Sequence, residues 1–286
     1  MYQFTKVANS ILVGTIHSIA AGSARLNLRR LLTWLIPFTF AISVQAVHAK
    51  SDLPALITQL KPSVVAIAIY NPTASPRLKL LGSGFAIAPG DLVVTNYHVV
   101  SAAINPAQNE SYVVLSGHGQ QPKIHQILKT SHAPQHDLAL LRIDSKLPAA
   151  RLAPADYVAE GTELAFTGYP ITGVLGLYPA THRALLSAVT PVAIPADNSQ
   201  VISAATLRQL REPFFIYQLD GTAYPGNSGS MLYRQDNGEV VGVINMVLVK
   251  KSREAVLSDP SGISYAIPIK HLHELIRQSS AEVKGS

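Results

Sequence analysis

The segment "DGTAYPGNSGSMLYRQDNGEVVGV", Asp220–Val243, places one serine, Ser228, between two glycines just before an apolar run. That run, "SMLYR", is separated from the next one, "VVGV", by the turn Asp236–Gly238. Short apolar runs divided by turns rich in Gly, Asn and Asp are typical of β-strands. The loop around Ser228 has two interpretations. It is either a glycine-rich turn, or the setting of an exposed nucleophile whose neighbouring backbone N–H groups face a substrate oxygen.

The same pattern of short runs and turns extends over most of the chain. A short helix is expected at Ser51–Leu60 and another at Pro268–Gln278, where apolar residues recur at helical spacing. The runs between them predict an all-β sandwich or barrel rather than alternating strands and helices. The Pro- and Ala-rich stretch Leu147–Ala159 divides the strands into two halves. The predicted strands are Ser63–Tyr70, Gly82–Ala88, Leu92–Asn96, Ser111–Leu115, Ile124–Leu128, Leu138–Ile143, Leu164–Gly168, Arg183–Val189, Phe214–Gln218, Ser230–Arg234, Val240–Val249 and Ile263–Ile267.

The segment 1–49 has the composition of an export signal. It holds four basic residues and no acidic one, and its uncharged part, Leu31–Ala49, ends in small residues. A basic flank, an apolar core and a small-x-small end are typical of a cleaved signal peptide, which predicts a periplasmic or secreted protein. A retained membrane anchor is the alternative, because the uncharged run approaches the ~20 residues that span a bilayer.

Charge and cysteine content exclude several other classes of function. Removing the four basic residues of the signal from 23 Lys and Arg leaves 19 against 17 Asp and Glu, a net charge of only +2. With no basic run in the remainder, no nucleic-acid partner is expected. The chain has no cysteine, which excludes disulfides, thiol catalysis and cysteine-based metal sites.

Two further residues could serve Ser228 as base and orienting group. His98, in "VVTNYHVVSAA", follows an apolar strand, and Asp137, in "HDLALLRI", opens another. Each alone is usually structural. Together they give the chain order His98, Asp137, Ser228, which is one of the known orders of the Ser-His-Asp triad.

These segments resemble trypsin-like proteases of the HtrA/Deg type. "TNYHVV" is similar to the base segment of that family, "DLALLRI" to its Asp strand and "GNSGS" to its nucleophile loop. "GSGF" (Gly82–Phe85) and "GISYAIPI" (Gly262–Ile269) also match, and the resemblance extends from about Asp52 to Gln278. Ser230 departs from the family by replacing a glycine. The resemblance does not include the PDZ module that HtrA proteins usually carry, so peptide-sensing regulation and a caged assembly are not expected.

The resemblance implies two six-stranded antiparallel β-barrels of the chymotrypsin-like type, with a short N-terminal and a C-terminal helix. The barrels are expected at 50–150 and 151–286, with the active site in the cleft between them. The resemblance also implies a serine endopeptidase that uses His98, Asp137 and Ser228, acts on proteins or peptides, and needs no cofactor or metal. The oxyanion hole falls on the backbone N–H groups of Gly226 and Ser228.

The primary specificity pocket can be located by alignment of the nucleophile loop. Its floor falls at Thr222 and its wall at Asn245, Met246 and Val247. Since Thr222 carries no charge, cleavage is expected after small or medium aliphatic residues rather than after Lys or Arg. Asn227 stands where trypsin-like zymogens have an Asp, so activation by a newly cut N-terminus is not expected.

Three alternatives differ from this hypothesis. An α/β-hydrolase needs G-x-S-x-G and the order Ser, Asp, His, neither of which is present. A metal site could be suspected among four histidines, but their spacing favours a solvated polar face. A catalytically silent peptide-binding relative of the same fold stays open, although such a protein would be expected to have lost a triad residue. The four histidines are His118, His125, His132 and His136.

Overall fold

The computed structural model describes residues 52–119, 121–170, 176–192, 214–245 and 262–284 of the chain. The predicted export signal, 1–49, lies outside the described residues, and so do Met246 and Val247. Among the helices that are described, none is long and apolar enough to cross a membrane.

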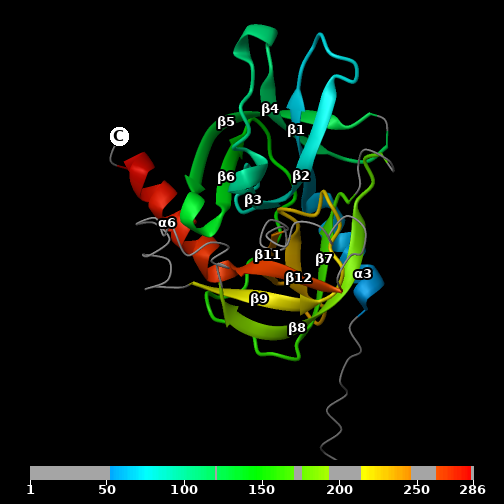
Figure 1. Ribbon diagram of the computed structural model, residues 1–286, viewed down its shortest axis with the longest axis vertical. Coiled ribbons are helices and arrows are strands. Elements are labelled where there is room, and N and C mark those ends of the chain that lie inside the picture. The colour runs from blue at the N-terminus through cyan, green and yellow to red at the C-terminus, as the bar shows by residue number, and fades with distance from the viewer. Residues whose placement is uncertain (1–51, 120, 171–175, 193–213, 246–261, 285–286) are drawn as a thin grey trace, which may run out of the picture. The chain divides into compact units, whose positions relative to one another are not determined.

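In the described part of the chain, twelve strands form two closed antiparallel barrels (Figure 1). The neighbours in the first barrel run β1-β2-β3-β6-β5-β4, and in the second they run β7-β8-β9-β12-β11-β10. The two orders are equivalent, although the sequence has no recognisable internal repeat. The strands are β1 Val64–Tyr70, β2 Leu78–Ile87, β3 Leu92–Asn96, β4 Ser111–Ser116, β5 Lys123–Ala133, β6 Leu138–Ile143, β7 Glu163–Gly168, β8 Ala180–Pro191, β9 Phe215–Asp220, β10 Met231–Arg234, β11 Val240–Asn245 and β12 Ile263–Pro268.

The all-β prediction with two six-stranded barrels is therefore confirmed. The predicted strands differ from the observed ones mainly at their ends. β2 begins at Leu78 rather than at Gly82, and β5 continues to Ala133 rather than ending at Leu128. These extensions are amphipathic or largely exposed and pair with neighbouring strands, so pairing rather than apolar content keeps them extended.

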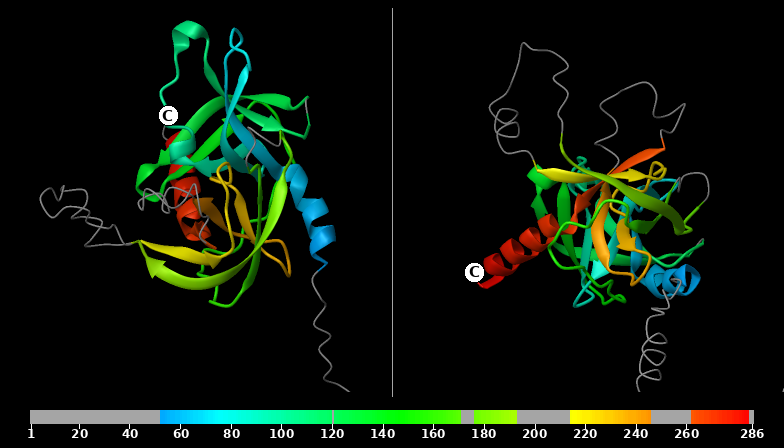
Figure 2. Two further views of the ribbon diagram at one scale, coloured as in Figure 1. Left: turned by 45° about the vertical axis from the view of Figure 1, so that its right-hand side comes forward. Right: turned by 90° about the horizontal axis from the view of Figure 1, so that it is seen from below.

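Two α-helices flank the barrels among the described residues. α3, Leu53–Leu60, is capped by Asp52, whose side chain accepts a hydrogen bond from the Ala55 N–H at 3.3 Å. α6, Ile269–Lys284, follows β12 directly and buries Ile269, Leu272 and Leu275. Figure 2 shows α6 leaving the second barrel and running beside the first. It contacts β5 and β6 as well as β11 and β12, so it joins the two barrels.

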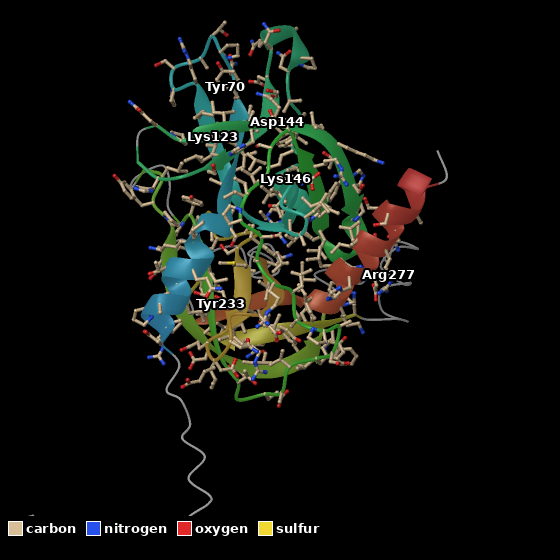
Figure 3. All side chains as sticks on the ribbon, turned by 180° about the vertical axis from the view of Figure 1, so that it is seen from behind. Tyr70, Lys123, Asp144, Lys146, Tyr233 and Arg277 are labelled. Atoms are coloured by element: carbon tan, nitrogen blue, oxygen red, sulfur yellow. The ribbon has the colours of Figure 1, made fainter. Side chains whose placement is uncertain are left out.

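Alternating residues of β1 show how a short apolar strand serves two cores. Val64, Ala66 and Ala68 belong to a cluster that extends into the second barrel, whereas Val65 and Ile67 belong to a cluster confined to the first. This is the two-residue period of a strand buried on both faces. In the second barrel the core includes Tyr233, which is fully buried and labelled in Figure 3.

Candidate active site

Strand pairing brings His98 and Asp137 together. Asn96, the last residue of β3, pairs with Leu138, the first residue of β6. His98 lies in the 3-10 turn Tyr97–Val99 that follows β3, and Asp137 directly precedes β6. As a result, His98 Nδ1 is 2.6 Å from Asp137 Oδ2, and the His98 backbone N–H donates to Asp137 Oδ1 at 2.8 Å.

Asp137 is held by several further hydrogen bonds. Its backbone has a left-handed φ of 50°, and its carbonyl accepts from the Tyr97 N–H and from Asn96 Nδ2, both at 3.1 Å. Asn245 Nδ2 donates to Asp137 Oδ2 at 2.8 Å. A carboxylate that faces Nδ1 favours the proton on that nitrogen, which leaves Nε2 of His98 as the basic nitrogen.

Ser228 lies in the loop between β9 and β10, and only 6% of it is exposed. The Gly229 N–H donates to the Ile244 carbonyl at 2.9 Å, which attaches the loop to β11. The Ser83 N–H of β2 donates to the Ser228 carbonyl at 2.8 Å. Backbone bonds therefore fix the serine to both barrels.

The N–H groups of Gly226 and Ser228 differ from those around them. Within the described part of the chain, neither donates a hydrogen bond, whereas the N–H groups of Asn227, Gly229 and Ser230 all do. Gly226 has a φ of 99°, a left-handed conformation that favours glycine. Two unused donors beside a serine are what an oxyanion site requires.

The Ser228 hydroxyl itself makes no hydrogen bond to His98 or to any other residue that the structure describes. Catalytic serine–histidine bonds are often long in the absence of substrate and shorten when it binds. The contact between His98 and Asp137 is therefore formed in this structure, whereas a hydrogen bond between His98 and Ser228 is not.

Comparison with known proteins shows which family the chain belongs to. The trypsin-like peptidase domain matches residues 82–243, which is more than half of the chain and includes His98, Asp137 and Ser228. The chain belongs to the trypsin-like peptidase family.

The individual relatives are of the HtrA type. A protein named "Probable periplasmic serine endoprotease DegP-like", from Marinomonas sp. (strain MWYL1), is 28% identical over 211 residues, which are 72% of this chain and 37% of that protein. The chain thus spans little more than a third of this curated relative.

Two solved structures share the fold. The active form of a protease from M. tuberculosis has a TM-score of 0.55 at 23% identity, covering 80% of this chain and 86% of that one. The HtrA-type protease AlgW, solved with a tripeptide, has a TM-score of 0.54 at 24% identity, covering 79% of this chain and 62% of that one.

Ser83 is attached to this candidate site, although the sequence indicated it only as a member of the "GSGF" motif. Its hydroxyl donates to the Gly226 carbonyl at 2.7 Å and accepts from the Tyr169 N–H at 2.8 Å. The Ser83 carbonyl accepts from Thr95 Oγ1 at 2.7 Å. One side chain of the first barrel therefore anchors the loop that carries Gly226. A hydroxyl residue between glycines in an apolar run was the available signal.

The residues assigned to the specificity pocket lie in two places. Thr222 is half-buried, and the loop that carries it is held by Ser264, whose hydroxyl accepts from the Ala223 N–H at 2.8 Å and donates to the Gly221 carbonyl at 2.5 Å. Asn245 ends β11 with its amide on Asp137, a contact with the triad candidate that the sequence did not indicate.

His182 packs against Tyr224, which lies shortly before Ser228 in the loop between β9 and β10. Its ring is stacked on that of Phe166, with 5.0 Å between the ring centroids, and is tilted against that of Tyr224, with 5.6 Å between the centroids. Nε2 of His182 is buried without a hydrogen-bond partner among the described residues. Burial lowers the pKa of this imidazole below its usual range and so favours its neutral form.

The four histidines suspected from the sequence do not form one cluster. His125 is buried between Ser116, at 2.7 Å, and Ser145. His132 is stacked on Tyr97, and His118 lies beside Tyr178. His136 instead meets residues of α6.

Proposed function

We propose that this chain is a serine endopeptidase that hydrolyses peptide bonds in proteins or peptides. The observation that carries the proposal is the 2.6 Å contact between His98 Nδ1 and Asp137 Oδ2, together with the unused backbone N–H groups of Gly226 and of Ser228 itself. A serine hydroxyl is a weak nucleophile at neutral pH and needs a neighbouring base.

In the proposed reaction, His98 Nε2 takes the proton of Ser228 as Oγ attacks the substrate carbonyl. Asp137 holds the His98 ring and stabilises the imidazolium that forms. The negative charge that develops on the carbonyl oxygen is received by the N–H groups of Gly226 and Ser228. His98 then gives its proton to the leaving amine, and water hydrolyses the acyl-enzyme by the same steps.

A preference for small or medium aliphatic residues before the scissile bond follows from the pocket assignment. Thr222, placed at its floor, carries no charge, and a buried substrate cation without a partner is strongly unfavourable. Apolar pockets discriminate by only ~10- to 200-fold per methylene, so the preference should be broad.

Residues 1–49 are proposed as an export signal ahead of two barrels at 50–150 and 151–286. The periplasmic names of the relatives support an exported protein.

Asn227 is fully buried in this chain and cannot form an ion pair with a newly cut N-terminus. Activity should therefore depend on loop ordering by substrate or a partner rather than on proteolytic trimming.

A fluorophosphonate, which reacts with activated serines, tests the proposal directly. The purified protein should be labelled at one residue, and Ser228→Ala should abolish the label. His98→Ala and Asp137→Asn should each reduce peptide hydrolysis by about 10⁴-fold or more with the fold intact. A folded protein that binds peptides but neither labels nor hydrolyses them would instead establish the catalytically silent relative.

A further inference from the structure

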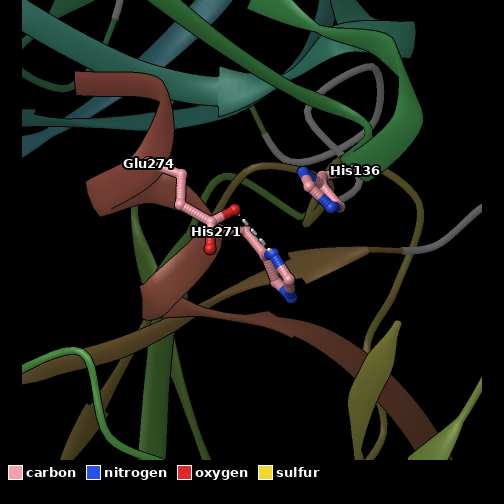
Figure 4. A group of neighbouring side chains, drawn as sticks. All are labelled: His136, His271 and Glu274. Carbon is pink, nitrogen blue, oxygen red and sulfur yellow. Dashed lines mark hydrogen bonds and ion pairs between the residues drawn. The ribbon is translucent and has the colours of Figure 1, made fainter. Parts of the chain in front are cut away.

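A second group of chemically active side chains lies next to Asp137. His136 closes the 3-10 turn Pro134–His136, and His271 and Glu274 belong to α6. A ring nitrogen of each histidine and a carboxylate oxygen of Glu274 lie within 4.8 Å of one another. Figure 4 shows these three side chains together. The proposed hydrolysis uses none of them.

Helix geometry and ring packing create this arrangement. His271 and Glu274 are three residues apart on α6 and so share one face, with His271 Nδ1 at 3.3 Å from Glu274 Oε2. The rings of His136 and His271 have centroids 4.1 Å apart, and both meet Phe214 edge-on. The first barrel thus supplies one of the three side chains and α6 supplies two.

The His271 side chain is buried, and one of its two ring nitrogens lacks a hydrogen-bond partner among the described residues. Only 5% of the residue is exposed, and within the described residues its Nε2 has no hydrogen-bond partner. A buried polar atom without a partner costs free energy. Hydrolysis at Ser228 gives no reason to retain an imidazole here rather than an apolar ring.

Both imidazoles are available as ligands at neutral pH. Burial, together with the neighbouring His271, lowers the pKa of His136 to about 4. Burial also lowers the pKa of His271, although Glu274 opposes this effect. A neutral imidazole is the form that binds metals.

We infer that His136, His271 and Glu274 form a binding site for one zinc-type divalent transition-metal ion. Two imidazoles and a carboxylate are a known zinc ligand set, usually with a water in the fourth position. Mg²⁺ and Ca²⁺ prefer oxygen ligands only. A tetrahedral zinc ion with bonds of about 2.0–2.2 Å needs donors about 3.3–3.5 Å apart. His271 Nδ1 and Glu274 Oε2 already lie 3.3 Å apart, and the three donor atoms of the group lie within 4.8 Å of one another.

Such an ion would connect the two parts of the protein that meet here. His136 immediately precedes Asp137, whereas His271 and Glu274 lie on the helix that follows the second barrel. Metal binding would therefore hold the segment that carries the candidate orienting carboxylate against α6. The sequence led to no expected metal site, because only His136 of the three was among the histidines considered.

Zinc titration of the untagged Ser228→Ala protein against a chromophoric chelator tests this inference without using activity. One Zn²⁺ per chain should bind, and Zn²⁺ should raise the melting temperature, whereas Mg²⁺ and Ca²⁺ should not. Glu274→Gln is nearly isosteric on a partly exposed side chain and should fold, as far-UV circular dichroism would verify. Both Glu274→Gln and His136→Gln should weaken zinc binding by about 100-fold or more and remove the thermal shift.

His118→Gln is the matched control, because this histidine lies beside Tyr178, away from the cluster. It should bind zinc as the parent does. Absence of stoichiometric binding to the folded parent would overturn the inference and leave the three side chains as an aromatic and polar packing cluster. Equal affinity in the parent and in both cluster variants would overturn it as well. Because Ser228 is absent throughout, neither result depends on the proposed hydrolysis.

Discussion

Asn245 Nδ2 donates a 2.8 Å hydrogen bond to Asp137 Oδ2, the same carboxylate oxygen that lies 2.6 Å from His98 Nδ1. Asn245 is the last residue of β11 in the second barrel, whereas Asp137 and His98 belong to the first. One side-chain bond therefore joins Asp137, the candidate orienting carboxylate of one barrel, to a strand of the other.

Asn245→Ala should lower kcat by about 10- to 100-fold with little change in KM, because a hydrogen bond to a charged group contributes about 1.5–3 kcal/mol. Steady-state kinetics on a peptide substrate measure this effect. Asn237→Ala, in the exposed turn after β10, is the control. A rise in KM at constant kcat would assign Asn245 to the substrate pocket instead.

Ser83→Ala should impair catalysis by releasing the loop that carries Gly226, whose N–H is a proposed oxyanion-hole donor. The variant loses the bonds to the Gly226 carbonyl and the Tyr169 N–H, which lie at 2.7 and 2.8 Å. We expect kcat to fall by about 10-fold or more and stability to fall by about 1–3 kcal/mol, since a buried donor loses its partner. Ser280→Ala, at an exposed position of α6, should change neither quantity. Unaltered kcat in Ser83→Ala would mean that the loop is ordered without this anchor.

Gly168 provides the space that Ser230 occupies. A Cβ at Gly168 would lie 1.8 Å from Ser230 Oγ and 2.6 Å from Ser83 Oγ. Gly168→Ala should therefore destabilise the protein by about 3 kcal/mol or more, and adding Ser230→Gly should restore part of the loss. Urea unfolding of both single variants and the double variant measures the coupling. Additive losses would show that the contact with Ser230 is not the cause.

Thr222→Asp should change which bonds are cut. A carboxylate at the assigned pocket floor would pair with a substrate cation, so a peptide-library digest should gain cleavage after Lys and Arg relative to the parent. Asp220→Asn in the parent is the companion variant and should leave the aliphatic preference unchanged. A parent digest already dominated by cuts after Lys or Arg would contradict the pocket assignment.

His182 should make stability depend on pH. Because burial lowers its folded-state pKa below the ordinary value of 6.5, the unfolded chain takes up the proton first. This contribution to stability is present above pH 6.5 and is lost as the pH falls below it. His182→Phe keeps a stacked ring that does not titrate. The stability of this variant relative to the parent should therefore rise as the pH is lowered from 7 to 5. A difference that is independent of pH would contradict the neutral, buried imidazole.

The strands, the two helices and the three triad candidates could be predicted because their signals are local. Apolar runs between turns define a strand whatever its neighbours are, and Gly226 and Gly229 mark the backbone required around Ser228. Strand ends were less predictable. The first residues of β2 and the last of β5 are extended because other strands pair with them.

The sequence by itself thus determined the all-β class, the division into two halves and the His98, Asp137 and Ser228 candidates. Only the tertiary structure decided which strands are neighbours, including the same strand order in both barrels, and which distant side chains meet. Ser83 on Gly226, Asn245 on Asp137, and His136 beside His271 and Glu274 all join segments far apart in the chain. The physical reason is that hydrogen bonds and metal-binding geometry depend on spatial separation after barrel closure, which the local pattern of residues does not encode.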